Sequence, residues 1–236
     1  LFRSYIGIFT LLCYYYLNFL QKNLPNKNYQ GFYLILFTKI TGSILFAFIM
    51  YLAVYPNSDS FGYFAGAKWF NKINNPSSEF LLFFYNLFLN YKNLPLFEVS
   101  QLNNYTQPSA SAFAMLKFIS PFTYLGHNRF LTTNILISFF NVWGAWSLFR
   151  VFTAYEQKSK TLFIFLLFCF PSILFYTNSI LKDSFIYAAI GLFILGAYLL
   201  NQRSNILYAI FILIFSSFIM IELKLYIFLL LLNTFA

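Results

Sequence analysis

Acidic residues are scarce in this chain, as are most residue types that build soluble active sites. Its 236 residues include only six Asp and Glu, one His and two Cys, and charged residues make up 9% of the total. Soluble globular domains average about 25% charged residues, so this composition excludes that class. Cys13 and Cys169 lie within apolar runs, where a thiol behaves as a small hydrophobe, and imply neither a disulfide nor a metal site.

Motifs of soluble enzymes are missing as well. The chain has no glycine-rich phosphate loop, no Ser-His-Asp order and no spacing typical of metal ligands, so chemistry on soluble nucleotide sugars is disfavoured. The 15 Lys and Arg give a net charge of +9, but they are scattered between apolar runs. This scatter argues against binding of nucleic acid and favours Lys and Arg retained in cytoplasmic loops.

Apolar residues are abundant: they make up 60% of the chain, with 35 Phe and 19 Tyr. A membrane-spanning helix needs about 20 mainly apolar residues, and no segment alternates as a barrel strand does. We therefore predict an all-α fold, a polytopic transmembrane helical bundle forming one domain over residues 1–236. The chain begins with Leu and stops within an apolar run, which predicts a part of a longer protein. The expected spans are residues 4–20, 33–55, 130–149, 161–180, 184–200, 205–221 and 225–236.

The distribution of Lys and Arg predicts the orientation of these spans. Basic residues occupy the linkers 21–30 and 150–160 and the linker after Leu200. Placing these linkers in the cytoplasm makes residues 56–129 a long external loop. It also places Asp59 and Asp183 on the same external side. Lys39, inside an apolar run, is expected to snorkel to the cytoplasmic surface.

The external loop is expected to carry helices that lie along the membrane. Apolar residues share one face over residues 61–72, as in an interfacial helix, and a second such helix is expected over residues 79–90. The third segment, 109–125, is apolar enough to enter the bilayer. Lys117 at its centre and the dipeptide Ser120-Pro121 favour a partly embedded helix over a full span. If it did span, Asp183 would lie in the cytoplasm.

A family resemblance follows from this arrangement. The loop opens with Asn57-Ser58-Asp59-Ser60-Phe61-Gly62-Tyr63, Gln107-Pro108-Ser109 precedes its last helix, and Leu181-Lys182-Asp183-Ser184 forms a second external turn. Over about positions 33–221 the chain resembles the GT-C superfamily of polytopic glycosyltransferases, such as the mannosyltransferases that use dolichyl phosphate mannose. Departures from the family are the single Asp in place of a paired acidic motif and the extra span over residues 4–20.

The resemblance implies an activity and its partners. It implies transfer of a sugar from a polyprenyl-phosphate-linked donor to a glycan, lipid or protein acceptor, with membrane lipids and membrane proteins as further partners. It places the chain in the inner membrane of a bacterial envelope. Some branches with paired acidic motifs use a divalent cation, and because this chain lacks the pair, no cofactor is expected.

Asp59 is the candidate base for this chemistry. A carboxylate within hydrogen-bond reach can take the proton of the acceptor hydroxyl, and acids at a membrane boundary tend to be functional. The alternative is that Asp59 only caps the helix that starts near Ser60. Tyr63, one turn further on, is expected to orient an acceptor or to act as an interface anchor.

Four further residues complete the candidate binding site. Lys182 could bind the lipid phosphate as a point charge while Asp183 positions it, although Asp183 also suits the first turn of a helix. His127 and Arg129, just before a span, could meet a phosphate or snorkel to the surface. Glu222 and Lys224 are expected to form an ordinary solvated charge pair at an external turn.

The sequence therefore predicts a membrane glycosyltransferase with Asp59 as its base. Two alternatives from other classes stay open. A polysaccharide polymerase or ligase of another fold predicts essential Arg or Lys in large external loops. A transporter or scaffold subunit predicts polar residues at mid-membrane and interrupted spans, for which Pro171 is the one hint.

Overall fold

Every regular element in the computed structural model is a helix among the residues it describes, which are 30–54, 58–74, 109–155 and 170–235. This confirms the all-α fold. The helices are α2 (Gln30–Ile49), the π-helix η1 (Met50–Val54), α3 (Asp59–Asn74), α6 (Ala110–Leu125), α7 (Phe130–Tyr155), α9 (Pro171–Tyr176), α10 (Lys182–Asn201) and α11 (Ile206–Phe235). The predicted segments 4–20 and 79–90 lie outside the described residues.

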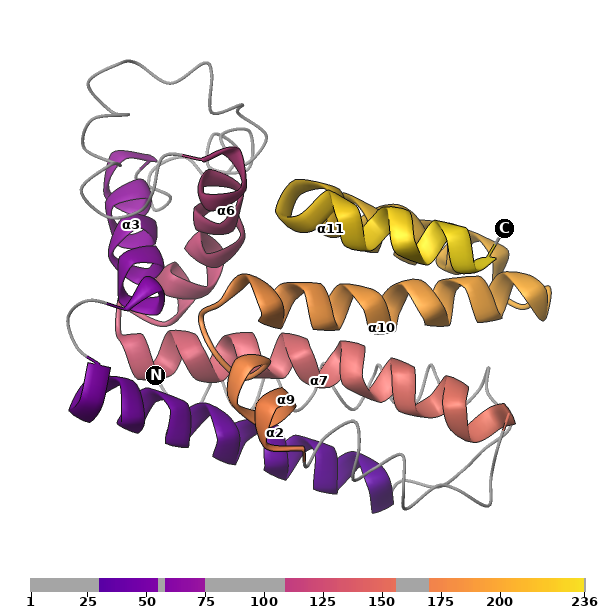
Figure 1. Ribbon diagram of the computed structural model, residues 1–236, viewed down its shortest axis with the longest axis horizontal. Coiled ribbons are helices and arrows are strands. Elements are labelled where there is room, and N and C mark those ends of the chain that lie inside the picture. The colour runs from indigo at the N-terminus through magenta and orange to yellow at the C-terminus, as the bar shows by residue number, and fades with distance from the viewer. Residues whose placement is uncertain (1–29, 55–57, 75–108, 156–169, 236) are drawn as a thin grey trace.

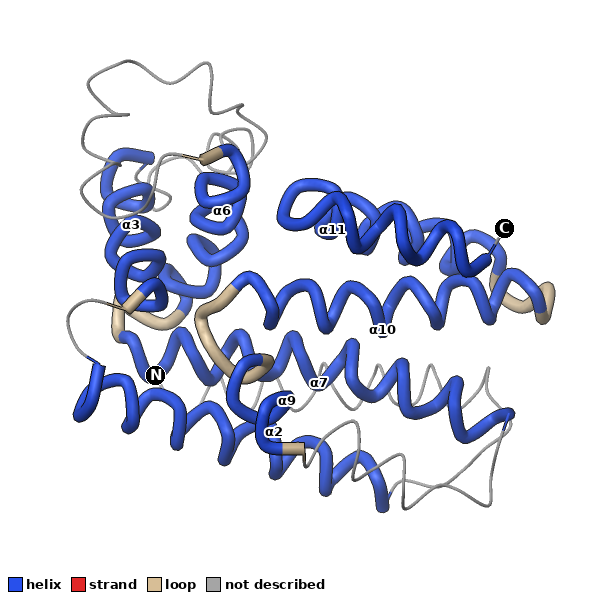
Figure 2. Tube along the Cα trace, viewed as in Figure 1, coloured by secondary structure: helices blue, strands red, loops and turns tan. Residues whose placement is uncertain are grey.

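Two groups of helices build the molecule. Four helices are long and apolar enough to cross a membrane: α2 with η1, α7, α10 and α11. Figure 1 shows these helices with their axes nearly parallel, whereas α3 and α6 stand across them at one end. The tube in Figure 2 shows that short loops join α6 to α7 and α9 to α10 at this same end. The chain is an integral membrane protein with a crosswise helical pair at one end of its bundle.

The predicted spans agree with the long helices except near their ends. The expected spans 33–55, 130–149 and 184–200 correspond to α2 with η1, α7 and α10. Helix α7 continues six residues further than expected, to Tyr155. Arg150, placed by the sequence in a linker, therefore lies inside the helix and is buried, with its guanidinium over the Trp146 ring.

The predicted span 161–180 does not end as one continuous helix. Residues 161–169 lie outside the described ranges, and Pro171 opens the six-residue helix α9 at its first turn. Proline suits that position because its missing N–H has no partner in a first turn. The chain then turns over residues 177–181 before α10 begins. The C-terminal end of this predicted span is therefore interrupted.

Helix α11 consists of two helices that meet at Lys224, whose φ of −152° and ψ of 80° are not helical. On α10, the Phe193 ring packs on Phe228, while Gly196 contacts Leu213. In one straight helix, Leu213 and Phe228 would lie about 22 Å apart, too far to reach neighbouring turns of α10. The chain therefore folds back at Lys224, as the separate segments 205–221 and 225–236 predicted.

Helices α3 and α6 pack together as a pair. The Asn71 side chain on α3 donates hydrogen bonds to the Ser120 carbonyl and the Thr123 hydroxyl on α6, at 3.0 and 2.8 Å. Helix α6 has only 16 residues and is not among the candidate spans. The prediction that residues 109–125 do not form a full span therefore agrees with the length of this helix.

Helix α6 continues through Pro121 because a side chain replaces the missing donor. Proline at this position cannot donate to the Lys117 carbonyl one turn earlier. The Ser120 hydroxyl donates to that carbonyl at 3.0 Å. The helix therefore continues through the Ser120-Pro121 dipeptide, and the Lys117 carbonyl keeps a hydrogen-bond donor.

Helices α7 and α10 approach so closely that only glycine fits at their crossing. A Cβ added at Gly191 would lie 2.1 Å from the Gly144 carbonyl oxygen, and one at Gly144 would lie 2.3 Å from the Ala188 Cα. Small residues permit such approach between membrane helices. This contact fixes α10, and with it Lys182 and Asp183, against α7.

We expect Gly191→Ala to destabilise the protein by about 1–3 kcal/mol, because backbone atoms must move apart to admit the methyl group. Unfolding of the purified protein in mild detergent would measure this loss. Gly196→Ala is the matched control on the same helix, since its Cβ meets chiefly the Leu213 side chain, which can shift. Equal losses in the two variants would contradict the close-packing explanation.

Candidate functional site

Polar side chains from three helices gather at the end of the bundle that carries α3 and α6. Asp59 and Tyr63 come from the start of α3, Lys182 and Asp183 from the start of α10, and Lys224 from the turn inside α11. The charges of Asp59, Asp183 and Lys224 all act on Lys182. Asp59 and Asp183 therefore lie at one site, although they are 124 positions apart in the chain.

Ser58, and not Asp59, occupies the capping position of α3. The Ser58 carbonyl accepts the backbone N–H groups of Phe61 and Gly62, and its hydroxyl lies 3.5 Å from the Phe61 nitrogen. Asp59 is the first residue of the helix and is exposed. Within the described part of the chain its carboxylate has no hydrogen bond and no ion pair. The Asp59 carboxylate is therefore open to a substrate at the start of α3.

Lys182 reaches across to both helices of the crosswise pair. Its ammonium nitrogen donates a 2.9 Å hydrogen bond to the Ser111 hydroxyl on α6 and lies 5.8 Å from the centre of the Tyr63 ring on α3. The side chain is half-buried. Lys182 thus presents a positive charge beside Asp59, in a position held by Ser111 and Tyr63.

Asp183 is neutralised by Lys224. The Lys224 ammonium donates to the Asp183 carboxylate, and both side chains stay partly exposed. The expectation that Glu222 pairs with Lys224 is wrong, because the turn in α11 directs Lys224 toward the start of α10. Asp183 does lie in the first turn of its helix, as expected.

Tyr63 stays a hydroxyl donor at this site. Burial raises the pKa of Tyr63, and the negative charges of Asp59 and Asp183 raise it further. A phenol whose pKa lies above its ordinary value remains protonated throughout the neutral range. Tyr63 can therefore donate a hydrogen bond to a substrate oxygen while its ring faces Lys182.

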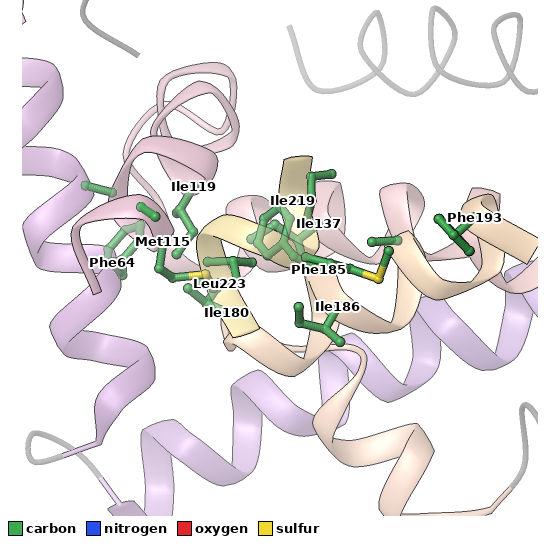
Figure 3. Packing of buried hydrophobic residues seen from close by; sticks show 14 residues of the cluster. Phe64, Met115, Ile119, Ile137, Ile180, Phe185, Ile186, Phe193, Ile219 and Leu223 are labelled. Atoms are coloured by element: carbon green, nitrogen blue, oxygen red, sulfur yellow. The ribbon is translucent and has the colours of Figure 1, made fainter. Parts of the chain in front are cut away.

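Buried apolar side chains come from the same helix ends as the polar groups. Figure 3 shows Phe64 of α3, Met115 of α6, Ile180 of the α9–α10 turn and Leu223 of α11 in one buried cluster with Phe185 of α10. All four side chains are buried. This cluster packs α3, α6, α10 and α11 against one another next to the polar residues.

His127 and Arg129 occupy the turn between α6 and α7. Both are exposed, and His127 has a left-handed backbone with φ of 52°. The following residue, Phe130, stacks on the Phe61 ring at 4.3 Å between centroids, so this turn lies beside the first turn of α3. The two basic residues belong to the same end of the bundle, and their role in binding phosphate stays a prediction.

The prediction that Lys39 snorkels to the surface is wrong. Lys39 has no exposed surface, and its nitrogen donates a 2.5 Å hydrogen bond to the Thr177 hydroxyl in the turn after α9. It also lies 4.5 Å from the centre of the Tyr187 ring. Since position 39 lies nine residues inside α2, the helix ends are too far to reach, and the side chain packs inward against the interrupted span.

Sequence reasoning missed three polar partners: Ser111, Lys224 as the partner of Asp183, and Thr177. Only Ser111 had a local signal, because it lies in the first turn of a helix predicted beside the site. Across the described ranges, no three His, Cys, Asp or Glu side chains gather to hold a metal ion.

Comparisons with known proteins found no match to a protein-family model, a curated protein or a solved structure. A functional assignment therefore depends on the chemistry of the site itself.

Proposed function

We propose that this protein is a membrane glycosyltransferase that moves a sugar from a polyprenyl phosphate to an acceptor hydroxyl. The observation that carries the proposal is the exposed carboxylate of Asp59 beside the cation of Lys182, at one end of a membrane-spanning bundle. These are the two charges that the reaction needs, a base for the acceptor and a positive charge for the departing phosphate.

The proposed chemistry assigns each group one task. The acceptor oxygen attacks the anomeric carbon of the sugar while Asp59 takes its proton, and the bond from that carbon to the phosphate oxygen breaks. The electron pair leaves with the phosphate, whose growing negative charge Lys182 stabilises. Tyr63 donates to a substrate oxygen, and Asp183 with Lys224 holds the end of α10 that presents Lys182.

The helices around the site suit a substrate that is anchored in a membrane. Helices α3 and α6 lie across the spans at one end of the bundle, as interfacial helices do. In the proposed arrangement Asp59, at the start of α3, meets the lipid headgroups at the membrane surface. A lipid-linked sugar can then reach Lys182 and Asp59 without leaving the bilayer. By the distribution of basic linkers this is the external face of the membrane. We take that membrane to be the inner membrane of a bacterial envelope, as the family resemblance implies.

Transport of a lipid-linked substrate is a second candidate function. Lys39 is fully buried within a span, and the span that contacts it is interrupted at residues 177–181. Ionisable groups inside membranes often mark transport pathways. Transport predicts that a labelled lipid-linked sugar crosses vesicles without forming a product, and that Lys39→Met stops this movement.

The deciding experiment is a transfer assay in membrane vesicles that contain the protein. A polyprenyl phosphate carrying a radiolabelled sugar is supplied with a soluble acceptor glycan, on one face at a time. We expect a labelled product only when the acceptor reaches the face that carries Asp59, and none when a nucleotide sugar replaces the lipid donor. Labelled lipid that crosses the vesicle while the acceptor stays unlabelled would refute transfer and support transport.

A further inference from the structure

A cavity of about 310 Å³ lies between the crosswise helix α6 and the spans α7, α10 and α11. Its volume is at the lower end of the range for small-molecule sites, about 300–1,000 Å³. Its walls consist mainly of six aromatic side chains: Phe118, Phe122, Phe140, Phe185, Phe215 and Phe218. Such a lining excludes polar solutes and suits a hydrocarbon chain.

The cavity has an apolar end and a charged end. On α11, Phe215, Phe218 and Glu222 follow one another on the same face, and seven residues of helix cover about 10 Å. Glu222 is exposed and lies next to the turn at Lys224, whereas Phe215 lies deeper along the span. A ligand in the cavity would therefore keep its polar part near the turn and its apolar part in the bundle.

The charged end carries one group of each sign. Lys117 lines the cavity from α6, is half-buried, and lies 5.1 Å from the centre of the Phe113 ring. Burial lowers the pKa of Lys117, and the charge of Glu222 across the cavity opposes that shift. The two charges are therefore near enough to face one bound headgroup together.

We propose that this cavity binds one acyl chain of a zwitterionic phospholipid with a primary ammonium in its headgroup. Lys117 binds the phosphate, Glu222 accepts hydrogen bonds from the ammonium, and the six phenylalanines enclose the chain. A purely anionic headgroup would meet repulsion from Glu222, and a purely cationic one would meet repulsion from Lys117. The site is separate from Asp59 and Lys182, and the inference is independent of the proposed transfer reaction.

Native mass spectrometry of the delipidated protein tests the proposal. The protein would be incubated with phosphatidylethanolamine, phosphatidylcholine or phosphatidylglycerol of identical acyl chains. We expect one retained phosphatidylethanolamine, at about ten-fold higher affinity than the other two lipids, because only its headgroup combines a phosphate with N–H donors for Glu222. Equal retention of all three lipids, preference for phosphatidylglycerol, or no retention by the wild type would overturn the assignment.

Three substitutions locate the binding. Glu222→Gln should remove the preference for phosphatidylethanolamine over phosphatidylglycerol. Lys117→Gln should weaken the binding of phosphatidylethanolamine and of phosphatidylglycerol by about ten-fold. Ala114→Phe should block the cavity, because Ala114 lines its wall. Lys72→Gln, at an exposed position of α3, is the control for charge. Wild-type selectivity in all three variants, with unchanged gel-filtration profiles, would place the lipid elsewhere and refute the proposal.

Discussion

Asp59→Asn is expected to lower the rate of sugar transfer by about 10²–10⁴-fold, the usual contribution of a general base. The amide keeps the size and polarity of the carboxylate but cannot accept the proton. Because Ser58 caps α3, the substitution should leave the helix in place. The measurement is the initial rate of labelled product in membranes with equal amounts of each protein.

A control separates this loss from a general effect on charge at the site. Lys72→Gln, at an exposed position further along α3, should transfer at the wild-type rate. Asp59→Glu should recover part of the activity, since it keeps a carboxylate one methylene further from the helix. Wild-type transfer by a folded Asp59→Asn protein would remove this residue from the mechanism.

The second large effect is expected at Thr177. Thr177→Val keeps the shape of the side chain but removes the acceptor for the buried nitrogen of Lys39. A buried polar group without a partner costs about 1–3 kcal/mol. The loss should appear as a lower free energy of unfolding in detergent. The Ile173 carbonyl keeps a partner in this variant, because the backbone N–H of residue 177 also donates to it at 3.0 Å.

A double-variant cycle isolates this interaction. Lys39→Met replaces the amine with an apolar chain of similar length and should be nearly neutral for stability, since it removes a buried polar group together with its need for a partner. Combined with Thr177→Val it should restore most of the lost stability. A double variant as unstable as Thr177→Val alone would show that Lys39 is not the reason for the loss.

Local sequence patterns predicted most of the individual helices. The lengths of the apolar runs identified four spans. Within a membrane a single segment can satisfy its backbone hydrogen bonds only as a helix, so each long apolar run indicates a spanning helix. The turn at residues 222–224 was also visible, because Glu222 and Lys224 interrupt such a run. Helix ends were less accurate: α7 extends past Arg150, whose charge suggested a linker.

The partners of the candidate residues were much less predictable. Asp183 and Lys224 are 41 positions apart, and Lys39 and Thr177 are 138 positions apart. No local pattern records such pairs, because they depend on where the chain turns and on which faces of the helices meet. The isolated sequence favoured a surface position for Lys39, since snorkelling costs less than burial unless another element supplies an acceptor.

The stretch from Ser58 to Phe70 shows both kinds of information. Its composition predicted a helix along the membrane surface with an acid at its start, since amphipathicity and charge at a helix start are local properties. Only the packing of α3 against α6, and of α10 against α7, brings Lys182 beside Asp59. Membrane class, helices and candidate residues thus follow from local chemistry, whereas the meeting of two distant charges at one site depends on helix contacts that form only in the folded bundle.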